Sequence, residues 1–289
     1  MARRDGRSAN QLRPPQVELR PLQRADGSAR FRFGDCTVLA AVYGPKEPRT
    51  RHRELCDRCT LDVVVRPRVG IPGPQERQME ALLARQLEYV VLATEYPRTQ
   101  ISVIVQMSCC DGSTAAVAGN AAHLALLDAG VAMKATAMCV ALGVTWEALV
   151  MGEDGDLGKM VKLSPEPVIW PLGVDLEASS GNKGQLDTYR LDPTELEEAQ
   201  CDALISLSMD GSRNQLVSHI SSGAPLDATI WSSCIEAADK SCKACLDTAF
   251  SRVSRDAGTA RRRHCGTVDR RGAGAVRKGS KRGWQFATG

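Results

Sequence analysis

"QMSCCDGSTAAVAGNAAHLALLDAG", residues 106–130, is the stretch that decides the fold, because it joins a strand to a helix through a tight turn. Alternating apolar residues predict a strand over 101–108, and small residues predict a helix over 115–127. Backbone N–H groups at the start of such a helix attract anions. The turn is therefore typical of a phosphate loop, yet Ala115 follows Thr114 where an arginine fork would grip a phosphate.

The sequence on either side of this stretch predicts a protein that mixes strands and helices. Two apolar segments within 30–43 meet at Gly34–Asp35 and indicate a pair of strands. Strands separated by helices favour an α/β or α+β sandwich. We predict further strands at 60–70, 135–144, 201–208 and 214–221, and helices at 75–94 and 226–253.

Charge is unevenly distributed along the chain. The net charge is only +3, but basic residues crowd both ends, and this asymmetry favours a polyanionic partner. The low aromatic content of 4% favours contacts with phosphates over stacking on bases. No apolar run approaches the roughly 20 residues of a membrane helix, so we expect a soluble, intracellular protein with no membrane partner.

Two segments lack the periodicity of the rest. Residues 152–189 are rich in Gly, Pro, Ser, Asp and Lys, which is typical of a long, disordered insertion loop. Residues 254–289 are rich in Arg, Gly and Lys with few apolar residues, which predicts a disordered basic tail. We expect this tail to strengthen binding of the polyanionic partner.

The cysteines and histidines offer a weaker signal. The pairs Cys56/Cys59 and Cys242/Cys245 could supply four thiolates to zinc, but the second pair lies on a predicted amphipathic helix, where cysteine packs as a small apolar residue. Packing is the favoured interpretation, and we expect reduced thiols and no metal. The four histidines are scattered, without metal spacing, and core or surface roles are favoured for them: His52, His123, His219 and His264.

An acidic segment, "LDPTELEEAQ" at 191–200, offers two interpretations. Its clustered carboxylates could act as a general acid or hold magnesium. The alternative, favoured on composition, is a polar turn that opens a helix, where acids are favourable near the N-terminus. Arg77, at the start of the 75–94 helix, is similarly either a phosphate ligand or a surface arginine.

Five ordered blocks resemble the RNase PH family. They are "RRDGRSANQLRP" (3–14), "ADGSARFRFGDCTVLAAVYGP" (25–45), "ERQMEALLARQLEYVVL" (76–92), "QMSCCDGST" (106–114) and the acidic segment. The resemblance implies the α+β, RNase PH-like fold (the ribosomal protein S5 domain 2-like β-α sandwich) as a single domain over 1–253, interrupted by the insertion. It also implies a six-membered ring around an RNA channel.

The active enzymes of this family cleave RNA from its 3′ end with inorganic phosphate. Their phosphate loop has an arginine at the position of Ala115, whereas Arg77, Ser113 and Thr114 remain candidate phosphate or RNA ligands. The resemblance places the catalytic acids on Asp192 and Glu198, of which the second is a glutamate in place of an aspartate. We therefore treat Asp192 and Glu198 as degenerate equivalents of the catalytic residues and assign a catalytic role to no residue.

Details of the blocks are most similar to a non-catalytic branch, called exosome component five in animals. That similarity implies a subunit of the eukaryotic RNA exosome that supports rRNA maturation and mRNA decay in nucleus, nucleolus and cytoplasm. The implied partners are other RNase PH-like subunits in a hetero-hexameric ring, cap subunits, a hydrolytic nuclease and RNA, without a cofactor. The alternative is an active phosphate-dependent 3′-to-5′ exoribonuclease, which would use inorganic phosphate.

Overall fold

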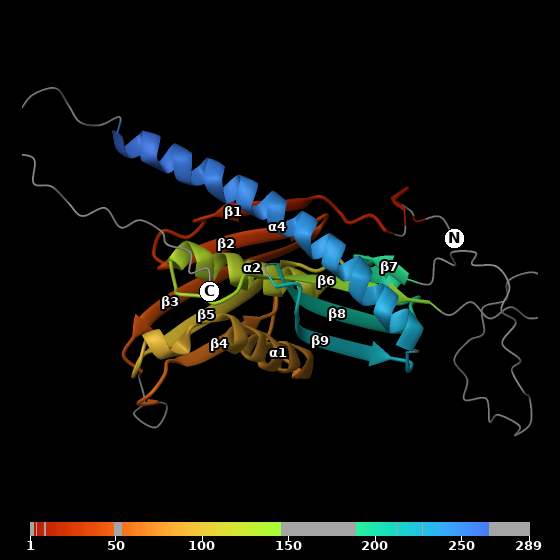
Figure 1. Cartoon of the computed structure of the whole chain (residues 1–289), viewed down its shortest axis with the longest axis horizontal. Helices are drawn as coiled ribbons and strands as arrows, with labels where there is room; N and C mark the ends of the chain where they lie inside the picture. The colour runs from red at the N-terminus through yellow and green to blue at the C-terminus, as the bar shows by residue number, and fades with distance from the viewer. Residues whose placement is uncertain are drawn as a thin grey trace, which may run out of the picture.

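The computed structural model describes residues 3, 5–8, 10–48, 54–145, 189–211, 213–226 and 228–265. Two sheets form the frame of the protein (Figure 1). The first sheet has the strand order β1 (Pro15–Leu19), β2 (Gly27–Phe33), β3 (Cys36–Lys46), β5 (Gln100–Cys109) and β4 (Thr60–Arg66). The second has the order β7 (Tyr189–Leu191), β6 (Ala137–Val144), β8 (Ala203–Asp210) and β9 (Leu216–Gly223).

The helices of the described residues follow the predicted pattern closely. They are α1 (Pro74–Val90), the short 3₁₀ helix η2 (Ala93–Glu95), α2 (Thr114–Ala129), α3 (Glu195–Glu198) and α4 (Ala228–Cys265). Helix α1 connects β4 to β5, which run parallel, as a crossover connection requires. None of the helices described is long and apolar enough to span a membrane.

The hairpin of β2 and β3 confirms the two strands predicted within 30–43. Their register pairs Phe33 with Cys36 across a turn in which Gly34 adopts a left-handed φ of 53°. Phe31 and Phe33 point inward and pack edge to face, with ring centroids 4.9 Å apart. This pair fixes which face of the first sheet points into the core.

Helix α2 is the most buried helix, which explains its small side chains. It packs on β2, β3 and β6, and every residue from Ala116 to Leu126 is buried. A Cβ on Gly119 would lie 2.5 Å from the Cys139 sulfur, so only glycine permits this approach of helix and strand. Asn120 secures the contact, since its side chain donates to the Cys139 carbonyl at 2.9 Å and accepts from the Cys139 N–H at 2.7 Å.

Helix α4 lies across β1 of the first sheet and β6 and β8 of the second (Figure 1). It continues to Cys265, beyond the predicted end at residue 253, so the predicted disordered tail begins with helical backbone. The remainder of that tail, 266–289, lies outside the described residues, as does 146–188, which includes nearly all of the predicted insertion. Tyr189, assigned to the insertion, is the first residue of β7.

The α+β sandwich is confirmed, whereas β1, η2 and β7 were not predicted as separate elements. One continuous apolar cluster joins the two sheets, with Phe31 and Val103 on one side and Leu142 and Ile205 on the other.

Candidate functional site

The predicted phosphate loop connects β5 to α2 in a conformation that few residues adopt. Gly112 has a φ of 70°, and Ser113, the N-cap of α2, has a left-handed φ of 54°. A Cβ on Gly112 would lie 2.4 Å from the Pro193 carbonyl oxygen. The Ser113 hydroxyl donates to the same oxygen at 3.0 Å. The loop is therefore packed directly against the acidic segment, which sequence alone placed about eighty residues away.

Asp192, the first candidate acid, is buried and held by Arg13. The guanidinium donates from Nη2 to Asp192 Oδ1 at 2.6 Å and from Nε to Oδ2 at 2.7 Å, a bidentate pair. The Arg13 backbone N–H adds a third contact at 3.1 Å. Asp192 also has a left-handed φ of 51°. The Asp192 carboxylate is therefore engaged in hydrogen bonds inside the protein.

Arg13 also reaches the phosphate loop. Its Nη1 donates to the Asp111 carboxylate and to the Asp111 carbonyl, both at 3.0 Å. Burial lowers the pKa of Arg13, but the hydrogen bond and the charge of Asp192 outweigh that effect, and the pKa is raised overall. One side chain thus ties the loop to the acidic segment as a cation.

Two further arginines of the N-terminal arm, which we define as Arg3 to Arg13, contact the acidic segment. Arg3 donates to the Leu191 carbonyl at 2.6 Å and lies 3.2 Å from a Glu197 oxygen. Arg7 lies 3.7 Å from Asp192 Oδ2. These three arginines belong to the basic N-terminal residues from which we predicted a polyanionic partner, and in the structure internal carboxylates and a carbonyl engage them.

Glu198, the second candidate acid, contacts the phosphate loop itself. The Ser113 N–H donates to Glu198 Oε1 at 2.5 Å. Burial raises the pKa of Glu198, and the Ser113 hydrogen bond opposes the rise only in part. The favoured interpretation of the segment as a polar turn opening a helix is also confirmed, because Glu197 accepts from the Thr194 N–H at 3.0 Å in a capping box.

The remaining candidate ligands surround the loop. Thr114 is the first residue of α2 and is half-buried, and Arg77 is exposed on the first turn of α1. Ala115 borders a small, mainly apolar cavity shared with Met79 and Leu82 of α1 and Ile220 of β9.

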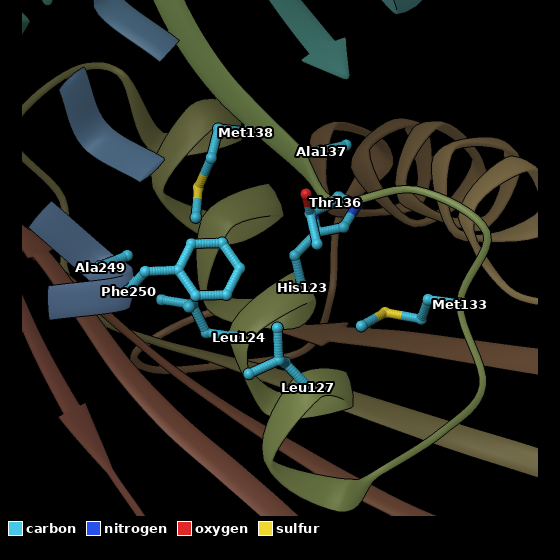
Figure 2. Close-up of a pocket in the computed structure, with 9 residues that line it drawn as sticks. All are labelled: His123, Leu124, Leu127, Met133, Thr136, Ala137, Met138, Ala249 and Phe250. Carbon is cyan, nitrogen blue, oxygen red and sulfur yellow. The ribbon is translucent and has the colours of Figure 1, made fainter. Parts of the chain in front are cut away.

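The predicted packing role of the cysteine pair on α4 is confirmed, and of the core and surface roles left open for His123 the structure shows the core role. Cys242 and Cys245 are buried, and burial raises the pKa of Cys245 to about 12, so its thiol stays protonated. His123 is buried beside a cavity of about 20 Å³ between α2 and α4 (Figure 2), and burial lowers its pKa to about 4. It is a neutral core residue, with Nδ1 2.7 Å from the Gly119 carbonyl.

The other candidate metal ligands are dispersed. Cys56 is exposed and Cys59 is buried. His219, on β9, is exposed and contacts the Trp231 ring edge to face. His52 and the side chain of His264 lie outside the described residues. Among the described residues, no three His, Cys, Asp or Glu side chains are grouped so that they could hold a metal ion.

Comparison with known proteins identifies the family. Models of the 3′ exoribonuclease family match residues 11–132 (domain 1) and 184–241 (domain 2). The crystal structure of rice (Oryza sativa) Rrp46 is 33% identical and superimposes with a TM-score of 0.69 over 87% of this chain and 100% of that one. This chain belongs to the RNase PH (3′ exoribonuclease) family. The predicted RNase PH-like fold is therefore confirmed.

Individual RNase PH relatives match part of the chain. Two proteins called "Exosome complex exonuclease RRP46 homolog" are 44% identical over 156 residues (Oryza sativa subsp. japonica) and 42% identical over 142 residues (Arabidopsis thaliana). These alignments span 54% and 48% of this chain, and 62% and 59% of the relatives, which is less than two thirds of their length. An Archaeoglobus fulgidus exosome subunit shares the fold, with 16% identity and a TM-score of 0.62.

Proposed function

We propose that this RNase PH-family chain is a non-catalytic ring subunit of an RNA exosome. In this role it helps to build the RNA channel and supports 3′-to-5′ RNA processing and degradation by other subunits. The observation that carries the proposal is the state of the phosphate loop. Ala115 stands where the family resemblance implies an arginine, while Asp192 and Glu198 are engaged inside the protein.

The loss of the arginine can be expressed as a magnitude. Hydrogen bonds to charged groups contribute about 1.5–3 kcal/mol, so a missing guanidinium weakens phosphate use by roughly 10- to 150-fold. Glutamate at residue 198 moves the carboxylate by one methylene, and a small displacement near the reacting atoms can itself cost about a hundredfold. Together these changes favour a structural role.

The proposal extends to partners and place of action. The names of the relatives and the family resemblance support other RNase PH-like subunits as ring neighbours in a hetero-hexamer, with cap subunits, a hydrolytic nuclease and RNA as further partners. We assign the chain to the branch called exosome component five in animals, acting in rRNA maturation and mRNA decay in nucleus, nucleolus and cytoplasm. No cofactor is required for this role.

The second candidate function is a phosphate-dependent 3′-to-5′ exoribonuclease. It is favoured by Thr114 and Arg77, which match the family's residues in the sequence, and by the word "exonuclease" in the names of the plant relatives. In this case inorganic phosphate attacks the terminal phosphodiester and a nucleoside diphosphate leaves.

Purified protein, incubated with 5′-labelled single-stranded RNA and with or without phosphate, separates the two functions. We expect no phosphate-dependent shortening and no release of nucleoside diphosphates. Release that disappears in Arg77→Ala would establish the enzyme instead. Affinity capture of the tagged chain from its own cells tests the ring role. Equal recovery with several different RNase PH-like chains is expected, whereas recovery of self-copies alone contradicts it.

A further inference from the structure

The start of α2 already holds an anion, and that anion belongs to the protein. We propose that Glu198 is an internal blocking group, whose carboxylate occupies the position at the phosphate loop where an external phosphate would bind. The inference deepens the proposed function and rests on its assignment of this loop. It assigns to Glu198 a role different from that of a degenerate general acid.

The contact has the geometry of an anion bound at a helix start. The Ser113 N–H, at the N-cap of α2, donates to Glu198 Oε1 at 2.5 Å. The Ser113 side chain makes no capping hydrogen bond to the helix, because its hydroxyl donates to the Pro193 carbonyl. Since the first N–H groups of a helix lack intrahelical partners, the carboxylate takes the role that a phosphate has in a phosphate loop.

The segment that carries Glu198 is fixed on both sides, so the contact is part of the fold. Before it, Asp192 is held by the two-pronged contact with Arg13. Within it, the Glu198 N–H donates to the Thr194 carbonyl at 2.8 Å, and the capping box of α3 orders the turn. The loop and the acidic segment are in close backbone contact, since a Cβ on Gly112 would lie 2.4 Å from the Pro193 carbonyl oxygen.

The surrounding charge opposes a second anion. The negative charges of Glu195 and Asp111 act on Glu198, so phosphate entering the loop would meet three carboxylates. Arg13 attracts Glu198, but Asp192 and Asp111 already accept hydrogen bonds from its guanidinium. With Ala115 in place of a cation, the loop favours its own carboxylate over inorganic phosphate.

Three variants separate two effects on phosphate binding: occupation of the Ser113 N–H by a side-chain oxygen, and negative charge near the loop. Glu198→Ala removes the carboxylate and frees the Ser113 N–H. Glu198→Gln removes the charge but keeps an oxygen that can accept from the same N–H. The matched control, Glu195→Ala, removes one charge from the exposed face of the same turn without touching Ser113. Binding of inorganic phosphate is measured by isothermal titration calorimetry on full-length protein, and circular dichroism and thermal melting check each fold.

Glu198→Ala is expected to bind phosphate at least about tenfold more tightly than the wild type, consistent with the loss of a competing charged hydrogen bond. Glu198→Gln and Glu195→Ala each remove one negative charge but leave the Ser113 N–H occupied, so each is expected to gain clearly less than Glu198→Ala. Equal gains in Glu198→Gln and Glu198→Ala would mean that charge alone excludes phosphate, and no gain in Glu198→Ala would show that the loop is not blocked by this side chain. Either result overturns the proposal.

A measurement on the wild type makes the test independent of variant stability. In a phosphate titration followed by NMR, the Ser113 amide signal is expected to stay unchanged, because its N–H is already bonded. A saturable shift of this signal would overturn the blocking role. Phosphate-dependent RNA cleavage by the wild type would contradict the non-catalytic function, whereas a phosphate-insensitive Glu198→Ala would contradict only the blocking role.

Discussion

Arg13→Ala is the substitution that most directly tests how the site is held together. Arg13 and Asp192 form a bidentate ion pair, and their side chains are only 5% and 1% exposed. Removing one partner of a buried pair costs about 3–5 kcal/mol, because the remaining charge loses its compensation. Arg7 still lies 3.7 Å from Asp192, so we expect the lower end, about 3 kcal/mol.

Chemical denaturation at neutral pH, followed by circular dichroism, measures this loss as a lower midpoint. The matched comparison is Asp111→Ala, which removes the other carboxylate that Arg13 contacts. Its side chain is 34% exposed, so solvent screens the pair and we expect a loss of about 1 kcal/mol or less. Arg13→Lys keeps the charge, loses the two-pronged geometry and should lie between the two.

A double-mutant cycle completes the test. If Arg13 and Asp192 depend on each other, the double alanine variant loses less stability than the sum of the two single variants. The reasoning fails if Arg13→Ala stays within about 1 kcal/mol of the wild type, or if Asp111→Ala costs as much as Arg13→Ala. It also fails if the two single losses simply add.

Three further predictions concern other parts of the chain. Gly112→Ala should cost about 2 kcal/mol or more in denaturation, because it combines a φ of 70° with a clash against the Pro193 carbonyl; Gly70→Ala, also at positive φ but in open space, is the control and should cost less. His123 should make the protein less stable as the pH is lowered. Its pKa is about 4 in the folded state and 6.5 in the unfolded chain, so the unfolded chain takes up the proton first, and up to about 3 kcal/mol of the free energy of unfolding is lost as the pH falls from 6.5 to 4. His123→Gln should flatten this part of the pH profile, and an unchanged profile would assign it to other groups. Native thiol alkylation, followed by peptide mass spectrometry, should modify the exposed Cys56 and spare Cys245, whose thiol is buried and protonated; equal modification would contradict the core assignment.

The fold was largely predictable because its main elements carry their own periodicity. Buried and less buried residues largely alternate along strands β2, β3 and β5. Helix α1 begins after Gly73 with Pro74, and α2 begins at the turn that contains Ser113 and ends at Gly130. Strand β7 could not be predicted in the same way, because its three residues are defined by pairing with β6. Strand β1 was missed because arginines on both sides obscured its alternation.

The site was predictable in its position but not in its connections. The family resemblance placed Ser113, Asp192 and Glu198 in one site, and their contacts confirm that they lie together. It gave no indication that Arg13, 179 residues away from Asp192 in the chain, would be its partner. Which cation meets which carboxylate depends on tertiary packing, and counting charges along the sequence therefore could not reveal the internal partners of the N-terminal arm.

The contacts of the arm and of Glu198 together mean that Ala115 is not the sole reason for expecting an inactive loop. An arginine at residue 115 would add a cation beside the loop, but Glu198 would still accept from the Ser113 N–H. The Ser113 N–H would therefore stay occupied by the Glu198 carboxylate, and the added cation would not free it. Ala115→Arg alone is therefore expected to gain less phosphate binding than Ala115→Arg combined with Glu198→Ala, and calorimetry on the two variants measures the difference.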